Sequence, residues 1–401
     1  MKNSTPALRF PEFDGEWDEK RLGDIATFIK GKGLSKADIS DNGAIECIRY
    51  GELYNSYQEV IHIVISKTNV NQKELIRSKK NDVIIPASGE SQIEIAKASC
   101  VMKEGVALGG DLNIIRSELN GIFLSYYLNN IKKKDIAILS QGISIVHLYT
   151  SQLKSLNLCV PGAPEQQKIA AFLTAVDDKI NQLTRKKTLL EQYKKGVMQK
   201  IFSQEIRFKD EKGKEFPEWE VKRLGDFFKE RIDFPNKELP LYSLTIADGI
   251  VPKSERYERS FLVNDENNAY KRMLTNDFAF NPMNLRFGAL ARHKELFDVS
   301  VSKYYNIFCC NEKADFKYME LFLTSYNMIG YYNRMATGSI IEKKRVHYLD
   351  FVNFKLLFPS LPEQQKIADF LTGIEKKIEH VNTQIEKTNA WKRGLLQQMF
   401  V

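Results

Sequence analysis

The chain has 401 residues, a length that suits two or three domains of ordinary size. Hydrophobic residues make up 43% and charged residues 27%, which excludes general disorder, and no run of about 18 uncharged apolar residues predicts a membrane-spanning helix. Basic residues outnumber acidic ones by 59 to 51, and this net charge of +8 permits an anionic partner without requiring one.

Residues 1–19 are expected to form an N-terminal arm. They contain no apolar run of the kind found in secretory signals. The five cysteines of the chain are scattered, without the spacing of a zinc site, and an odd number of unpaired cysteines is typical of a reducing compartment. We therefore expect a cytoplasmic protein without a resident metal.

The chain contains an internal repeat. The seven residues 164–170, Pro-Glu-Gln-Gln-Lys-Ile-Ala, recur at 362–368, an offset of 198. The string Lys-Arg-Leu-Gly-Asp at 20–24 recurs at 222–226 after a four-residue insertion. Seven consecutive identities do not arise by chance in a chain of this length, so residues 8–203 and 206–401 are two copies of one unit.

The segments 20–161 and 222–359 diverge strongly between the two copies, and we call them variable domain 1 and variable domain 2. Both are predicted to be α+β, with β-rich runs at 60–65 and 300–307 ahead of helical stretches at 122–130 and 318–326. A repeated frame with a varied middle favours a scaffold that carries two different recognition surfaces. Drift after an old duplication is the simpler alternative.

A long helix is predicted to close each copy, over 162–203 and over 360–401, with a linker arm at 204–221 between the copies. Steps of four and three from Ile169 or Ile367 meet mostly apolar residues, which is the pattern of a coiled-coil seam. Gly196 and Gly394, at equal positions in the last turns, suggest close helix contact there. The seam positions expected to form the helix-pair or partner interface are Ile169, Leu173, Val176, Ile180, Leu183, Ile367, Leu371, Ile374, Ile378 and Val381.

Each helix would run for roughly 57 Å and would need a partner to be stable in water. The obvious partner is the other copy. If the copies are equivalent, the second helix must return toward domain 1, so we expect an antiparallel pair with a variable domain at each end. Val401 should then end near the N-terminal arm.

No catalytic constellation is recognisable in the sequence. The glycine-rich string at 105–111 carries an acid where a phosphate-binding loop needs lysine. Asn281-Pro282-Met283-Asn284 lacks the second proline and the aromatic residue of an amino-methyltransferase motif, and the histidines are scattered. We therefore expect no catalytic residue in this chain.

These residues together resemble the specificity subunits of type I restriction–modification systems. The resemblance is carried by the two segments Val160–Gln166 and Phe358–Gln364, by the arm Arg9–Trp17, by the Lys-Arg-Leu-Gly-Asp string and by 81–89. It covers essentially the whole chain. It implies an α+β protein with two tandem DNA-recognition domains, related by a pseudo-twofold axis and joined by two long antiparallel coiled-coil helices.

The resemblance also implies a function. The subunit would not be catalytic: each variable domain would read one half of a bipartite site in double-stranded DNA, and the helix pair would set the spacer. Modification subunits, two in number, would bind S-adenosylmethionine and methylate adenine, and restriction subunits would use ATP and Mg²⁺ to translocate and cleave. Inserting about four residues, roughly one turn, into a helix is expected to change the spacer alone.

The DNA-binding candidates are basic or amide side chains beside turn-forming residues, because arginine pairs with guanine and asparagine or glutamine with adenine. A solvated loop charge is the alternative for each of them. The candidates are Lys30, Lys32, Lys36, Ser88, Ser91, Gln92 and Gln141 in domain 1 and Asn284, Arg286, Arg292, Lys343, Lys344 and Arg345 in domain 2.

A function of another class also fits the repeat, namely a coiled-coil scaffold whose duplicated domains bind proteins. It would direct no methylation to a bipartite DNA motif. The target sequence, the spacer length and the subunit stoichiometry are not encoded in any pattern of the chain.

Overall fold

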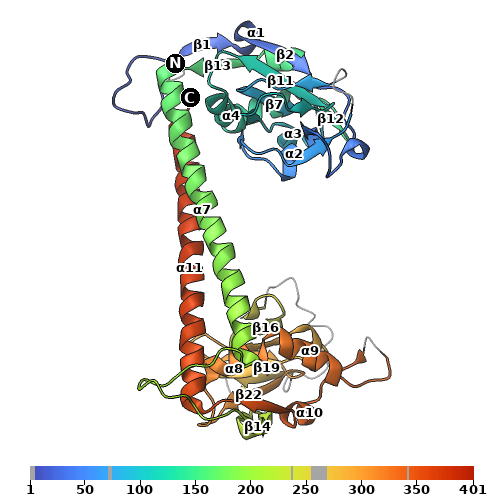
Figure 1. Cartoon of the computed structure of the whole chain (residues 1–401), viewed down its shortest axis with the longest axis vertical. Helices are drawn as coiled ribbons and strands as arrows, with labels where there is room; N and C mark the ends of the chain where they lie inside the picture. The colour runs from blue at the N-terminus through green and yellow to red at the C-terminus, as the bar shows by residue number, and fades with distance from the viewer. Residues whose placement is uncertain (1–4, 71–74, 236–237, 254–268, 341–342) are drawn as a thin grey trace. The chain divides into compact units, whose positions relative to one another are not determined.

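A computed structural model describes residues 5–70, 75–235, 238–253, 269–340 and 343–401 of the chain (Figure 1). These residues form two compact units. Unit 1 comprises 1–186 and 381–401, and unit 2 comprises 187–380. Each unit therefore contains one variable domain together with part of both long helices, α7 (Ala163–Phe202) and α11 (Leu361–Gln398).

In unit 1, variable domain 1 is built on two small sheets. The five-stranded sheet has the order β2-β11-β7-β9-β4 and the four-stranded sheet the order β5-β3-β10-β6. The strands are β1 (Asp18–Arg21), β2 (Ala26–Lys30), β3 (Ile45–Ile48), β4 (Val60–Ile61), β5 (Ser66–Thr68), β6 (Ile76–Arg77), β7 (Asp82–Pro86), β8 (Ser88–Gly89), β9 (Ser99–Val101), β10 (Ala107–Leu108), β11 (Leu112–Ser117), β12 (Val146–His147) and β13 (Asn157–Val160). Strand β7 is buried along its whole length, as its run of Val, Ile and Ile predicts.

Short helices cover this sheet and connect it to α7. They are α1 (Leu22–Ile25), the 3-10 turn η1 (Lys36–Asp38), α2 (Tyr50–Asn55), α3 (Gln92–Ile95), α4 (Gly121–Asn129), α5 (Lys133–Leu139) and α6 (Thr150–Lys154). Helix α4 begins where the Asn120 side chain accepts a hydrogen bond from the amide of Phe123, which is an N-cap. Strands β1 and β13 pair antiparallel and bring the end of the domain back to its start.

The core of unit 1 extends from the domain onto both long helices. Ile169, Leu173 and Val176 near the start of α7 are buried in the same cluster as Leu395 and Met399 near the end of α11. The two helices are therefore antiparallel here, as predicted. The expected meeting of the termini is also confirmed, because the amide of Leu8 donates a 2.9 Å hydrogen bond to the carbonyl of Gln398.

Unit 2 also combines a variable domain with part of both long helices, and its core is rich in aromatic residues. Its four-stranded sheet has the order β15-β22-β19-β20, and its two-stranded pairs are β14–β23, β16–β17 and β18–β21. The strands are β14 (Glu220–Arg223), β15 (Phe228–Glu230), β16 (Tyr242–Thr245), β17 (Gly249–Pro252), β18 (Tyr270–Met273), β19 (Phe278–Phe280), β20 (Leu290–Arg292), β21 (Val299–Ser302), β22 (Asn306–Cys310) and β23 (Lys355–Phe358). The helices are η3 (Leu224–Asp226), η7 (Leu285–Phe287), α8 (Phe316–Leu323), α9 (Tyr326–Met335) and α10 (Tyr348–Val352).

The helices of unit 2 are antiparallel as well. Ile201 at the end of α7 shares a buried cluster with Ile367, Leu371 and Ile374 at the start of α11. Of all the predicted seam positions, eight are buried, and Ile180 and Ile378 are partly buried beside the same clusters. The α+β class with two long antiparallel helices is thus confirmed.

The repeated Asn-Asp at 81–82 and 276–277 has a structural explanation. Asn81 and Asn276 both adopt a positive φ, 79° and 68°. The carboxylates of Asp82 and Asp277 accept hydrogen bonds from the amides of the residues three positions earlier, at 2.7 and 2.8 Å. Each pair therefore closes the turn before a central strand, and asparagine tolerates the left-handed conformation better than most residues.

Two predicted strands are wrong in part. Within 60–65 only Val60–Ile61 is a strand, and Ile63 and Ile65 are 78% and 60% exposed, so the apolar run does not indicate burial. The run 300–307 is divided between β21 and β22 by a turn at 303–305. In both cases residues of high β-propensity follow one another without a break, but a neighbouring strand pairs with only part of the run.

The expected close contact at Gly196 and Gly394 is also wrong: among the described residues, a Cβ added at either position meets nothing within 4 Å. Gly196→Ala should therefore raise the free energy of unfolding by about 0.5–1 kcal/mol, because alanine loses less entropy in a helix. Urea unfolding measures this. Gly23→Ala is the contrasting variant, since its Cβ would lie 2.8 Å from the carbonyl oxygen of Lys154, and it should destabilise the protein.

Candidate DNA-recognition surfaces and the helix clamp

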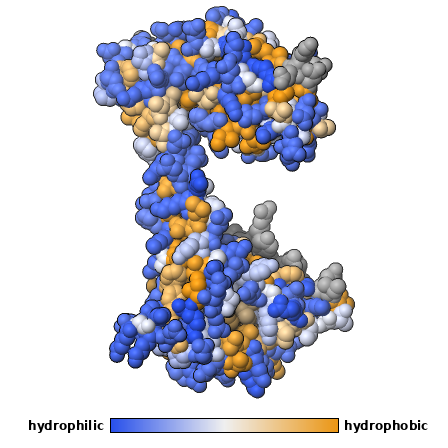
Figure 2. Space-filling view, viewed as in Figure 1, coloured by the Kyte–Doolittle hydropathy of each residue, from blue (hydrophilic) through white to orange (hydrophobic). Residues whose placement is uncertain are grey.

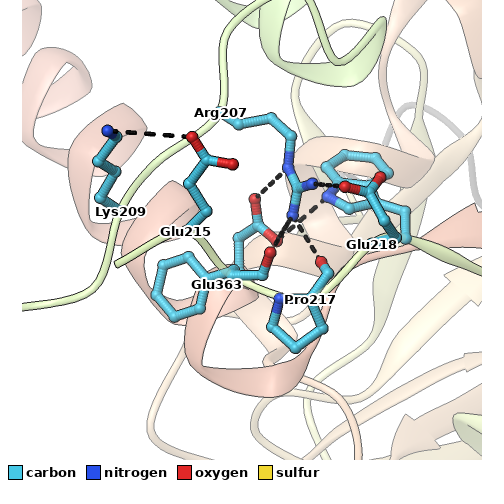
Figure 3. A network of polar contacts seen from close by, with 8 residues as sticks. Arg207, Lys209, Glu215, Pro217, Glu218 and Glu363 are labelled. Atoms are coloured by element: carbon cyan, nitrogen blue, oxygen red, sulfur yellow. Dashed lines mark hydrogen bonds and ion pairs between the residues drawn. The ribbon is translucent and has the colours of Figure 1, made fainter. Parts of the chain in front are cut away.

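The repeated Pro-Glu-Gln-Gln motif holds the arm against the start of each long helix. In unit 1 the guanidinium of Arg9 donates to both carboxylate oxygens of Glu165, at 2.8 and 2.7 Å. In unit 2 Arg207 donates to both oxygens of Glu363, at 3.3 and 3.1 Å (Figure 3). Because two parallel bonds fix the direction of approach, each pair sets how the arm crosses the helix. We call these pairs and the adjacent glutamines the helix clamps.

The clamp of unit 2 has further members. Trp219 Nε1 donates to Glu363 at 3.2 Å. Arg207 also donates to the carbonyl of Pro217 and to the exposed carboxylate of Glu218 (Figure 3). The Glu363 side chain is completely buried. Its hydrogen bond raises the pKa of Arg207, and Glu165 does the same for Arg9. A raised pKa is expected here, because a neighbouring carboxylate stabilises the charged form of arginine.

The glutamine that follows the clamp glutamate is also buried in both copies. Gln166 donates to the carbonyl of Pro161 at 2.8 Å and accepts from the amide of Asn120 at 2.9 Å. Gln364 makes the same two bonds with Pro359 and Asp315, at 3.1 and 3.0 Å. Since Asn120 and Asp315 are the N-caps of α4 and α8, each glutamine joins the long helix to the covering helix of its domain. Sequence reasoning found the motif but missed this role.

In variable domain 1 some DNA-binding candidates are brought together. Ser88 on β8 pairs with His147 on β12, and Gln141 exchanges two backbone hydrogen bonds with His147, at 2.9 and 2.7 Å. Ser91 caps α3 and Gln92 follows it, exposed. Ser88 itself differs from expectation: it is buried, so its hydroxyl is not a free surface group. Lys30, Lys32 and Lys36 are exposed on the end of β2 and on the segment through η1.

A cavity of about 490 Å³ lies beside β8. Tyr50, Tyr54, Glu90 and Glu94 are among the residues that line it, and the Tyr54 hydroxyl donates to the carbonyl of Ser88 at 2.8 Å. Apolar patches interrupt the hydrophilic surface of this domain (Figure 2). Ile143, at the tip of the 141–147 hairpin, is 99% exposed. This hairpin and its neighbourhood therefore offer aromatic, acidic and apolar contacts rather than positive charge.

In variable domain 2 one candidate, Arg292, is engaged in contacts within the protein. Arg292 donates to Glu320 at 2.8 Å and to Asn276 at 2.5 Å, lies over the Phe316 ring, and is only 13% exposed. That Arg292 contacts DNA stays a prediction. Asn284, Lys343 and Arg345 are exposed, and Lys344 is partly exposed. Arg345 exchanges backbone hydrogen bonds with Thr337, in a hairpin equivalent to 141–147 of domain 1.

Helix α9 contributes residues that sequence reasoning missed. A cavity of about 420 Å³ is lined by Arg286 together with Asn327, Asn333 and Arg334. Within the described part of the chain, the buried Nε of Arg286 has no hydrogen-bond partner, and its guanidinium lies 4.2 Å from the Phe287 ring centre. The available signal was the helical spacing of Asn327 and Arg334, which places both on one face.

Two further observations bear on chemistry. Among the residues that the structure describes, no three His, Cys, Asp or Glu side chains are grouped so that they could hold a metal ion. In the same residues, no helix has the length and apolar character needed to cross a membrane.

The sequence and the fold both match known proteins. Residues 14–192 match the family model of the type I restriction modification DNA specificity domain. The type I restriction enzyme MjaVIII specificity subunit of Methanocaldococcus jannaschii is 23% identical over 97% of this chain and 92% of its own length. The MjaIX specificity subunit of the same organism is 26% identical over 65% of this chain and 64% of its own length.

Solved structures agree on the fold. The S subunit of a type I restriction–modification system from M. genitalium matches with a TM-score of 0.60 at 14% identity, over 99% of both chains. A chain from a structural study of complex assembly and conformational transition in the type I system matches with a TM-score of 0.54 at 14% identity, over 96% of this chain and 97% of that one. Residues 14–192 thus match the type I restriction modification DNA specificity domain, and the chain over almost its whole length is similar to type I specificity subunits.

Proposed function

We propose that this chain is the DNA-reading subunit of a type I restriction–modification complex, with variable domain 1 and variable domain 2 each recognising one half of a bipartite site. The observation that carries the proposal is a contrast between the two copies. The helix clamps share their central bonds, from Arg9 to Glu165 and Arg207 to Glu363, and from Gln166 and Gln364 to the carbonyls of Pro161 and Pro359. The cavities of the two domains differ in charge, with Glu90 and Glu94 lining that of domain 1 and Arg286 and Arg334 lining that of domain 2.

The two cavities suit different base edges. Domain 1 offers carboxylates and tyrosines beside β8, and a carboxylate accepts from the amino group of cytosine. Domain 2 offers two arginines and two asparagines around η7 and α9, and these side chains pair bidentately with guanine and adenine or contact phosphates. Two readers of unlike chemistry on equal frames suit an asymmetric, two-part DNA site.

The remaining parts of the proposal concern spacing and partners. The variable domains would lie at opposite ends of the paired helices, whose length would set the spacer. Modification subunits would supply S-adenosylmethionine chemistry, and restriction subunits would supply ATP-driven translocation and Mg²⁺-dependent cleavage. The chain itself would supply sequence recognition and no catalytic residue.

The experiment that tests the proposal is methylation in the reconstituted complex. The full chain is co-expressed with a modification subunit from its source organism in a host lacking other adenine methylation, and methylated bases are located by single-molecule sequencing. We expect one bipartite motif with a fixed spacer. Methylation without a bipartite motif, or complex formation without methylation, would favour the protein-binding scaffold instead.

Arg334→Ala should change only the half-site read by domain 2. If Arg334 contacts a base edge, losing it costs about 1–3 kcal/mol at that position and relaxes one base of one half-site. The measurement is the methylated motif. Arg292→Lys is the control. The Arg292 side chain is already paired with Glu320, so this substitution should leave the methylated motif unchanged. A uniform fall in methylation over all sites would instead make Arg334 a phosphate contact.

A further inference from the structure

The two variable domains are attached to the long helices by different chemistry at equivalent places. The N-caps Asn120 and Asp315, each bonded to the clamp glutamine, align α4 with α8 residue by residue. In this alignment Tyr126 of α4 corresponds to Leu321 of α8. The equivalent position therefore carries a hydroxyl in unit 1 and an alkyl group in unit 2.

In unit 1 that hydroxyl belongs to a buried polar network. Tyr126 donates a 2.5 Å hydrogen bond to Asp177 of α7, and Lys392 of α11 lies 2.7 Å from the other oxygen of the same carboxylate. Glu59, just before β4, lies 3.6 Å from the Lys392 ammonium. The four side chains, which we call the domain latch, join the domain to both helices.

The latch is partly shielded from solvent, and the Asp177 and Glu59 side chains keep 22% and 18% exposure. Tyr126 is 1% exposed and Lys392 is 15% exposed, and the Lys392 ammonium lies 5.4 Å from the Tyr126 ring centre. Burial raises the pKa of Tyr126, and the Asp177 charge raises it further, so the hydroxyl keeps its proton and remains a donor. Charge-assisted bonds of this length are strong and directional.

Unit 2 keeps only part of this arrangement. Lys194 and Glu375, each 198 positions from Lys392 and Asp177, form an ion pair of 3.2 Å, but Glu375 is 54% exposed. Beside this pair lies a cavity of about 350 Å³, lined by polar residues that include Ser325, Tyr326 and Asn327 and by the apolar residues Met198, Phe202 and Ile378. Apolar contacts of this kind are not directional.

We propose that the domain latch is a positioning device: Tyr126, Asp177, Lys392 and Glu59 hold variable domain 1 at one orientation on the helices and so restrict the DNA spacers that the complex accepts. The proposal rests on the function proposed above. A domain that tilts on its helices shifts its half-site along the duplex without changing which bases it reads. The latch residues are positioning residues, because they act through the orientation of the domain.

The test uses the full chain in the modification complex and a DNA library in which both half-sites are fixed and the spacer varies by single base pairs. Tyr126→Phe keeps the ring and removes only the hydroxyl. We expect methylation at spacers one base pair longer or shorter to rise by about tenfold over wild type, the effect of losing one charge-assisted hydrogen bond. Lys392→Met should do the same, with both half-site sequences unchanged.

Lys194→Met is the matched control, because it removes the equivalent ion pair of unit 2. Its spacer profile should stay that of the wild type. If Tyr126→Phe and Lys392→Met lower methylation equally at all spacers, or leave the profile unchanged, the latch has only a structural role and the proposal is overturned.

A different result would contradict the proposed DNA-reading function itself. In that case the complex with the wild-type chain would methylate no bipartite motif at any spacer length. Thermal unfolding is measured for every variant. If Tyr126→Phe does not fold, Glu59→Gln removes only the outer charge of the latch, and the same broadened profile is required of it.

Discussion

Glu363→Ala should destabilise the protein by about 2–4 kcal/mol, the largest single-residue effect we expect outside the cores. The carboxylate is fully buried and bonds to Arg207 and Trp219, so its removal strands a partly buried guanidinium and an indole N–H. The Arg207 side chain retains 20% exposure, which moderates the loss because water can still solvate it. Urea-induced unfolding, followed by far-ultraviolet circular dichroism, measures the difference.

The chain offers a matched control on the same arginine. Glu218 lies 3.1 Å from Arg207 but its side chain is 89% exposed, so Glu218→Ala should cost less than about 1 kcal/mol. Glu165→Ala should reproduce the large effect in unit 1, where Arg9 is the partner. If Glu363→Ala were no more harmful than Glu218→Ala, the clamp would not be what holds the arm.

Lengthening both long helices by four residues should lengthen the DNA spacer by about two base pairs. Four helical residues add about 6 Å, and B-DNA rises about 3.4 Å per base pair. The insertions belong after Lys186 in α7 and after His380 in α11, at the chain boundaries between the compact units. Both half-sites should be unchanged in the methylated motif, because neither variable domain is altered.

The control is an insertion of equal length where no helix is extended. The turn at 211–213 is exposed, and Gly213 has a φ of +78° there, so four residues added in this turn should leave spacer and half-sites as in the wild type. A changed half-site with an unchanged spacer after lengthening the helices would contradict the idea that the helices measure the distance.

Much of the architecture could be predicted from sequence because its signals are local or repeated. The seam spacing from Ile169 and Ile367 predicts two long helices, and the 198-residue repeat predicts that they run antiparallel. Both are confirmed within each unit by the shared burial of Leu173 with Leu395 and of Ile201 with Leu371. The strand run at 60–65 failed because β-propensity does not specify a pairing partner.

What the sequence by itself determined, then, is the duplicated frame, its two long helices and its resemblance to type I specificity subunits. Only the tertiary structure decided which polar groups are free: Arg292 is bound to Glu320, whereas Arg334 joins Arg286 at a cavity. It also decided that Glu165 and Glu363 each bind an arginine 156 residues earlier in the chain. The physical reason is that an ion pair or a hydrogen bond depends on neighbours far apart in the chain, and no local pattern records them.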